Sequence, residues 1–163
     1  MKLLVSACLL GCPCRYDGRS RPCDAVLALR EKHILIPFCP EIYGGLPTPR
    51  TPAEIRDGRL ITKDGREVTE AYEKGAKAAL AVYDTLGCDG AILKAKSPSC
   101  GVGLVYDGTF TGTLVPGDGV TAACFRARGI PICTEECLLP MLSADTTEDT
   151  CICCKENAKE TRG

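Results

Sequence analysis

Short apolar runs alternate along the chain with stretches of helical periodicity, and this order predicts a fold class. The runs of strand length span residues 3–6, 33–38, 90–94 and 130–132. The stretches with apolar positions at helical spacing span residues 24–32, 68–86 and 119–128. Strands that alternate with helices in this way pair in parallel through βαβ units. The sequence therefore predicts an α/β fold, a single compact domain with an open, mostly parallel sheet and helices on both faces (Rossmann-like).

The segments between these elements are rich in turn-forming residues. Residues 11–22 contain Asp17-Gly18, and residues 40–52 contain four prolines and two glycines, so both are predicted to be loops. Residues 59–62 are predicted to form one arm of a small hairpin, and residues 102–110 a turn or hairpin around Asp107-Gly108. We expect the α/β domain to span residues 1–142. Residues 143–163 are polar and weakly patterned, which predicts a flexible, cysteine-containing C-terminal tail.

Composition and charge narrow the class of protein. Hydrophobic residues make up 45% of the 163 residues and charged residues 25%, and the net charge is −1. These values indicate a globular protein and argue against binding of polyanions through bulk electrostatics. The apolar run at the N-terminus is too short for a signal peptide, and no run reaches the length of a membrane span. We therefore expect a cytoplasmic protein without membrane partners.

Cysteine is the unusual feature of the composition, with 13 residues. An odd count without an export signal argues against a disulfide framework, and in a reducing compartment clustered thiols bind metal or take part in chemistry. Cys8, Cys39 and Cys100 each follow an apolar run. The carboxyl ends of parallel strands meet at one edge of a sheet, where ligands bind. The pattern therefore predicts that these three thiols converge on one site.

Three converging thiolates are compatible with zinc, with an iron–sulfur cluster or with no metal. A structural zinc site has four ligands and a catalytic zinc three plus water. An iron–sulfur cluster normally takes four cysteines, and with three it keeps one iron open as a Lewis acid. Cys133 also follows a strand and is a candidate fourth ligand. Cys12 and Cys14, in the first loop, could approach the same site. Cys151, Cys153 and Cys154, in the tail, are expected to have an accessory or incidental role.

Two other residues near these thiols carry candidate chemistry. Glu41 follows Cys39 by two positions, so it is either a general base beside a metal centre or a glutamate on a solvent-facing loop. Ser97 precedes Cys100 by three positions. Its hydroxyl either hydrogen-bonds a reacting group or caps the turn at Pro98.

Four stretches of the chain together resemble the thiouracil desulfidase (TudS) family. They are SACLLG with CRYDG, PFCPEIYGGLPTPR, LKAKSPSCG and VPGDGVTA. The resemblance implies a compact α/β protein with a 4Fe-4S cluster held by Cys8, Cys39 and Cys100, one iron being open to substrate. By the same resemblance, Glu41 and Ser97 occupy catalytic positions.

The resemblance also implies a non-redox reaction in which oxygen replaces the sulfur of a thiolated pyrimidine and hydrosulfide is released. The expected substrates are thiouracil, 4-thiouridine or its monophosphate. The chain has no basic patch and no added domain, so thiolated tRNA is a less favoured partner; the oligomeric state is left open. The alternative is a non-catalytic iron–sulfur or zinc-binding protein with Cys133 as fourth ligand. The extra thiols also leave room for a second, weaker metal site.

Overall fold

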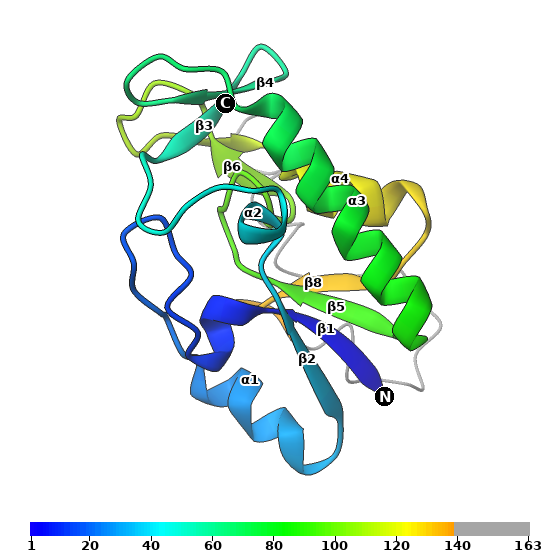
Figure 1. The fold of residues 1–163 in the computed structure, drawn as a ribbon. Helices are drawn as coiled ribbons and strands as arrows, with labels where there is room; N and C mark the ends of the chain where they lie inside the picture. Colours follow the sequence, from blue (N-terminus) through cyan, green and yellow to red (C-terminus); the bar gives the residue numbers. More distant parts are fainter. Residues whose placement is uncertain (139–163) are drawn as a thin grey trace, which may run out of the picture.

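A four-stranded parallel sheet forms the centre of the protein in a computed structural model, which describes residues 1–138 (Figure 1). The predicted tail and its cysteines lie outside the described residues. The strand order is β2-β1-β5-β8. The strands are β1 (Lys2–Ser6), β2 (Ile34–Phe38), β5 (Gly90–Leu93) and β8 (Ile132–Thr134). All three pairings are parallel, so the predicted α/β fold with a mostly parallel sheet is confirmed.

The register of the strands brings their carboxyl ends to one edge of the sheet. Ser6 at the end of β1 pairs with Phe38 at the end of β2, and Val5 pairs with Ile92 near the end of β5. The chain leaves β1 directly into a 3-10 helix, η1 (Ala7–Leu10), and leaves β2 through Cys39 into a one-turn helix, α2 (Pro40–Tyr43). The segments that carry the candidate thiols therefore start from neighbouring strands.

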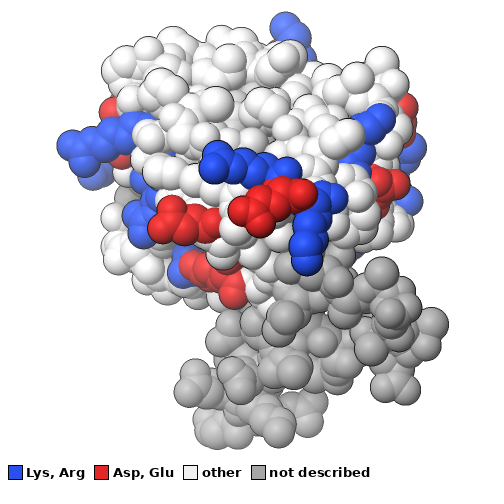
Figure 2. Space-filling view, turned by 90° about the horizontal axis from the view of Figure 1, so that it is seen from below, with Lys and Arg blue, Asp and Glu red and all other residues white. Residues whose placement is uncertain are grey.

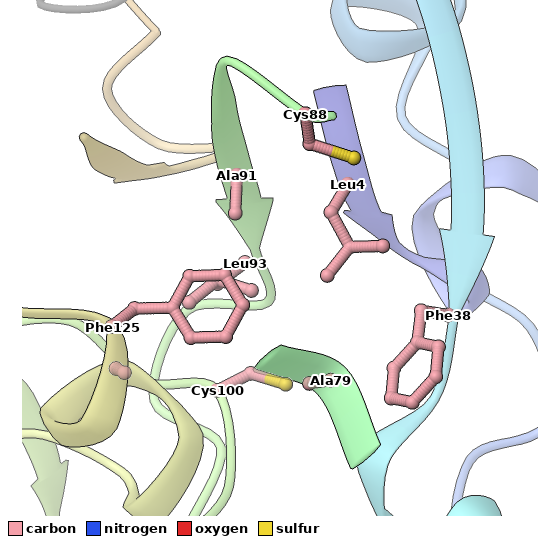
Figure 3. Close-up of a cluster of buried hydrophobic side chains, with 9 residues drawn as sticks. Leu4, Phe38, Ala79, Cys88, Ala91, Leu93, Cys100 and Phe125 are labelled. Atoms are coloured by element: carbon pink, nitrogen blue, oxygen red, sulfur yellow. The ribbon is translucent and has the colours of Figure 1, made fainter. Parts of the chain in front are cut away.

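Helices cover both faces of the sheet, as predicted. On one face, α3 (Thr69–Leu86) and α4 (Val120–Ala127) pack on a core that includes Leu4, Leu93 and Phe125. Figure 3 shows these side chains around a common interior, with Cys100 between Phe125 and Ala79. On the other face, α1 (Asp24–Ala28) contributes its buried Val26 to a second core cluster, and the short 3-10 helix η2 (Leu29–Glu31) follows it.

Two small antiparallel hairpins stand near the carboxyl edge of the sheet (Figure 1). One pairs β3 (Ala53–Arg56) with β4 (Arg59–Thr62), and the other pairs β6 (Leu104–Tyr106) with β7 (Leu114–Pro116). The sequence predicted β4 as one arm of a hairpin and a turn or hairpin over residues 102–110, but it did not predict strands at β3 or β7. The prediction that residues 40–52 form a loop throughout is wrong at its start, because Pro40 begins α2. Proline favours the first position of a helix, where no backbone donor is needed.

The close approach of α2 to α3 depends on glycine. A Cβ added at Gly75 would lie 1.9 Å from the carbonyl oxygen of Pro40, far inside van der Waals contact. We expect Gly75→Ala to reduce the free energy of unfolding by about 1–3 kcal/mol through overpacking. Urea unfolding of this variant beside Lys74→Ala, on an exposed position of the same helix, measures the effect. A stabilised Gly75→Ala protein, as alanine's helix propensity alone predicts, would contradict the close packing.

Candidate active site

A pocket of about 540 Å³ lies at the carboxyl edge of the sheet. Its volume is in the range that small-molecule sites occupy. Segments from the ends of β1, β2 and β5 and from both hairpins line it. Four cysteines are among the lining residues: Cys8, Cys14, Cys39 and Cys100. The structure thus brings the three predicted thiols together and adds Cys14, which the sequence left as an open candidate.

The positions of Cys8 and Cys39 follow from the turns at the ends of their strands. Cys8 lies in η1 and is 7% exposed, and its carbonyl accepts hydrogen bonds from the backbone N–H groups of Gly11 and Arg21. Cys39 has extended backbone angles and immediately precedes α2. The carbonyl of Cys39 accepts the N–H of Tyr43 at 3.1 Å, which begins the helix. Both thiols are therefore held by short helical turns.

Cys100 lies on a tight turn after β5 that Ser97 stabilises. The Ser97 hydroxyl oxygen accepts hydrogen bonds from the backbone N–H groups of Ser99 at 3.2 Å and Cys100 at 3.1 Å. The backbone N–H of Gly101 donates to the Ser97 carbonyl at 2.8 Å. Ser97 therefore caps the turn, as one of its two predicted roles requires. Its side chain also lines the pocket, so a role toward a bound molecule stays a prediction.

The surroundings of Cys14, Cys39 and Cys100 raise the pKa of each thiol and favour its protonated form. Burial raises the pKa of Cys100 to about 12, although hydrogen bonds from Ser6 and Ser99 act in the opposite direction. The hydrogen bond with Cys14, followed by burial, raises the pKa of Cys39. The Cys39 contact lowers the pKa of Cys14, but the Cys8 contact and burial outweigh it, and the result is about 11. Metal ligation by these residues would have to displace thiol protons.

The other candidate ligands lie elsewhere. Cys12 and Cys133 do not line the pocket. Cys133 is inside β8 and packs with Leu3 and Val5 in the core on the α1 side of the sheet, where burial raises its pKa to about 12. Cys14, in contrast, is close enough to Cys39 and Cys8 for both to shift its pKa, and its carbonyl accepts a hydrogen bond from Cys39 Sγ at 3.9 Å. Of the extra thiols weighed from the sequence within residues 1–138, Cys14 is the one placed beside the three strand-end cysteines.

Glu41 lies in the pocket wall and forms an ion pair. Its side chain is 13% exposed, so the solvent-facing alternative is wrong. Arg50, which is 7% exposed, donates a hydrogen bond from Nε to Glu41 Oε2 at 2.7 Å, and its Nη2 lies 2.6 Å from the same oxygen in the ion pair. Burial, followed by the charge of Glu41, raises the pKa of Tyr72. Tyr72 is therefore a neutral phenol beside this carboxylate.

The remaining pocket wall combines basic and aromatic side chains. Its basic residues are Arg15, Arg21, Arg50, Lys63, Lys94 and Lys96, and its aromatic residues include Tyr16, Phe38, Tyr106 and Phe110. Phe110 has a positive φ of 57°, and its backbone N–H donates to Glu54 Oε2 at 3.0 Å. The Glu54 carboxylate also accepts the N–H of Gly108 at 3.0 Å, which joins the two hairpins and fixes this wall.

Sequence reasoning missed three residues of the site: Ser6, Arg50 and Tyr72. Arg50 lies in the proline-rich segment that follows Cys39, and no sequence pattern pairs it with Glu41. Tyr72 falls on the buried side of α3, where it reads as an ordinary core residue. Ser6 ends β1, and its hydroxyl accepts the backbone N–H of Lys94 at 2.9 Å. No periodicity distinguishes such a serine from other strand termini.

The thiols line the walls of the pocket and do not meet at one point. Within residues 1–138, no three His, Cys, Asp or Glu side chains are arranged around a position for a single metal ion. Three thiols from separate strand ends around one cavity are nevertheless the donor set that an iron–sulfur cluster uses, because a cluster fills the space between its cysteines. The residues present therefore fit such a group.

No helix within residues 1–138 is long and apolar enough to cross a bilayer.

The fold and site define an α/β protein whose pocket joins convergent thiols to an ion-paired carboxylate, which is the arrangement of a metal- or cluster-dependent enzyme. The family model described as 2-thiouracil desulfurase matches residues 3–137. The chain belongs to this 2-thiouracil desulfurase family, which confirms the resemblance seen in the sequence motifs.

Two relatives extend the comparison. The Bacillus subtilis (strain 168) protein YbbK is 39% identical over 143 residues, which are 82% of this chain and 95% of YbbK. A solved structure of the [4Fe-4S]-dependent thiouracil desulfidase TudS is 44% identical, with a TM-score of 0.80, and the match covers 87% of this chain and 95% of that one. At this identity and TM-score the two chains share their fold.

Proposed function

We propose that this protein is a [4Fe-4S]-dependent desulfidase that replaces the sulfur of a thiolated pyrimidine by oxygen, without net redox change, and releases hydrosulfide. The observation that carries the proposal is the meeting of three strand-end thiols and an ion-paired carboxylate in one pocket. Membership of the 2-thiouracil desulfurase family and the likeness to TudS support it. A cytoplasmic location belongs to the same proposal, since a reducing compartment keeps thiols free.

Cys8, Cys39 and Cys100 are the proposed cluster ligands. All three line the pocket and come from the ends of β1, β2 and β5. A cluster with three cysteine ligands supplies an open iron, a Lewis acid suited to the soft sulfur of a thiocarbonyl. Cys14 is the neighbouring thiol that a closed, non-catalytic site would use, since it lines the same pocket as Cys8 and Cys39 and both shift its pKa.

Glu41 and Ser97 are the proposed catalytic residues. Glu41 takes a proton from water, the water oxygen bonds to the ring carbon, and the carbon–sulfur bond breaks. Thiouracil and water are thereby converted to uracil and hydrogen sulfide, so atoms balance and no electron donor is needed. The Ser97 oxygen accepts two backbone hydrogen bonds. Its hydroxyl proton is therefore the group that Ser97 offers to the substrate.

The pocket walls suit a thiolated base, nucleoside or nucleotide. Tyr106 and Phe110 present aromatic side chains on which a pyrimidine can stack. Arg15 and Arg21 also line the pocket and would favour the phosphate of 4-thiouridine monophosphate. On the face shown in Figure 2, basic side chains are interspersed with acidic ones. A nucleic-acid footprint is a basic patch or stripe, and this face carries none. The net charge of −1 likewise favours a small substrate over thiolated tRNA.

An anaerobic assay of the cluster-reconstituted protein tests this function. The substrates are 2-thiouracil, 4-thiouridine and 4-thiouridine monophosphate, with no reductant added. We expect loss of thiocarbonyl absorbance and equal amounts of oxygenated product and hydrosulfide from at least one of them. The cluster-free protein is the control and should be inactive. If protein with a full cluster consumes none of the three, or requires an electron donor, the proposed reaction is wrong.

A further inference from the structure

We infer that Arg50 is a positioning residue for the desulfidation reaction and acts by fixing the orientation of the Glu41 carboxylate. The inference rests on the proposed function, because it assigns Arg50 a part in the reaction of Glu41. An ionised carboxylate has about four lone-pair sites for hydrogen bonds. Arg50 engages Oε2, to which Nε donates at 2.7 Å and which lies 2.6 Å from Nη2 in the ion pair. With Oε2 held by the guanidinium, Oε1 is the oxygen that faces the reaction and accepts a proton from water.

Arg50 is itself anchored on several sides. Nη1 donates to the Pro47 carbonyl and to Thr48 Oγ1, each at 3.2 Å, and Nη2 donates to the Cys14 carbonyl at 3.0 Å. The backbone N–H of Arg50 donates to the Tyr16 carbonyl at 2.8 Å. The guanidinium therefore has a single orientation, and it ties the loop that carries Cys14 to the segment that carries Glu41.

This geometry needs arginine and not simply a positive charge. The planar guanidinium reaches Glu41 Oε2 with two nitrogens while it binds three other acceptors. A lysine ammonium is a point donor on a flexible stem and cannot make this set of contacts at once. Positioning errors of about 1 Å cost an enzyme on the order of a hundredfold in rate. Loss of the contacts between the Arg50 guanidinium and Glu41 should therefore affect turnover more than substrate binding.

A double-mutant cycle on the reconstituted enzyme tests the inference, with Arg50→Lys, Glu41→Gln and the double variant. We expect Arg50→Lys to lower kcat by roughly 10–100-fold and to leave KM and cluster absorbance near their wild-type values. In the Glu41→Gln background the same change should have little further effect, because no carboxylate is left to orient. Arg66→Lys, at an exposed arginine on the β4 side, is the matched control and should retain wild-type kcat.

A second readout uses the cluster-free protein and does not depend on activity. Removing one partner of a buried ion pair leaves the other charge uncompensated, so Arg50→Gln should lower the midpoint of thermal unfolding by roughly 6–20 °C. Adding Glu41→Gln to Arg50→Gln should restore part of that loss, since the unpaired carboxylate is then gone.

Several outcomes overturn the inference. Wild-type kcat in Arg50→Lys, or an equal loss in both Glu41 backgrounds, would make Arg50 a structural residue only and would leave the proposed reaction standing. The same holds if Glu41→Gln restores no stability to Arg50→Gln. If the wild-type protein with a full cluster consumes no thiolated pyrimidine, the proposed function itself fails and the inference falls with it.

Discussion

Replacing Cys100 by alanine is expected to remove the cluster and with it all turnover. Cys100 is 5% exposed and is one of the three thiols that come from strand ends into the pocket. The substitution leaves two of the three proposed ligands. Even the loss of a residue that only hydrogen-bonds a metal ligand lowers the affinity for the metal by about 10–100-fold. Iron per chain after anaerobic reconstitution should therefore fall by at least about tenfold, as measured by iron and acid-labile sulfide analysis.

Cys124→Ala is the matched control for this experiment. Cys124 lies on α4, is partly exposed and does not line the pocket. The control variant should bind iron and turn over substrate like the wild type. Full iron content in Cys100→Ala, with activity retained, would show that the cluster uses other thiols and that the proposed ligand set is wrong.

Replacing Glu41 by glutamine is expected to leave the cluster in place and to lower kcat by about 10²–10⁴-fold, the usual contribution of a general base. Glutamine has nearly the shape of glutamate but cannot accept the proton from water. It also leaves the buried Arg50 guanidinium without its carboxylate, which should cost roughly 3–5 kcal/mol of stability. Activity is therefore measured well below the unfolding midpoint, on samples matched for cluster absorbance.

Glu70→Gln serves as the control, because Glu70 is exposed on α3, away from the pocket. It should keep the wild-type kcat. Were Glu41→Gln to turn over substrate at the wild-type rate with the same cluster content, the general-base role would have to be given to another group, and Glu41 would have only a structural part in the pocket.

The position of the site could be predicted from the sequence because it depends on topology. Apolar runs that alternate with helical segments require parallel pairing, and parallel strands end at a common edge. Cys8 and Cys39 follow β1 and β2 almost directly, so their convergence needed no knowledge of side-chain packing. Cys100 lies farther along, on a turn that Ser97 closes in the segment that follows β5.

The choice among the extra thiols could not be predicted in this way. The apolar run at residues 130–132 suggested a strand that ends before Cys133, whereas β8 spans Ile132–Thr134 and contains it. Successive residues of a strand point to opposite faces of the sheet. Because Cys133 lies inside β8 and not after it, its thiol points to one face, where it packs in the core with Leu3 and Val5. Cys14 reaches the pocket through the path of an irregular loop, which no periodicity encodes.

The partners of Glu41 were also beyond prediction from sequence. Arg50 meets Glu41 because the segment between them folds back on itself and is fastened to the loop that contains Cys14 and Tyr16. Tyr72 reaches the same carboxylate from α3, a distant element. Such contacts depend on tertiary packing, and turn residues such as proline and glycine indicate only that the chain changes direction.

The central claim is that three cysteines hold the cluster and leave one iron free for substrate. Mössbauer spectroscopy of protein reconstituted with isotopically enriched iron, before and after anaerobic addition of 2-thiouracil, tests this claim most directly. We predict one distinct iron site whose parameters change on addition of the thiopyrimidine while the other irons are unaffected. Four irons that are all insensitive to the thiopyrimidine would contradict the account and would indicate a closed site with a fourth protein ligand, for which Cys14 is the nearest thiol beside Cys8 and Cys39.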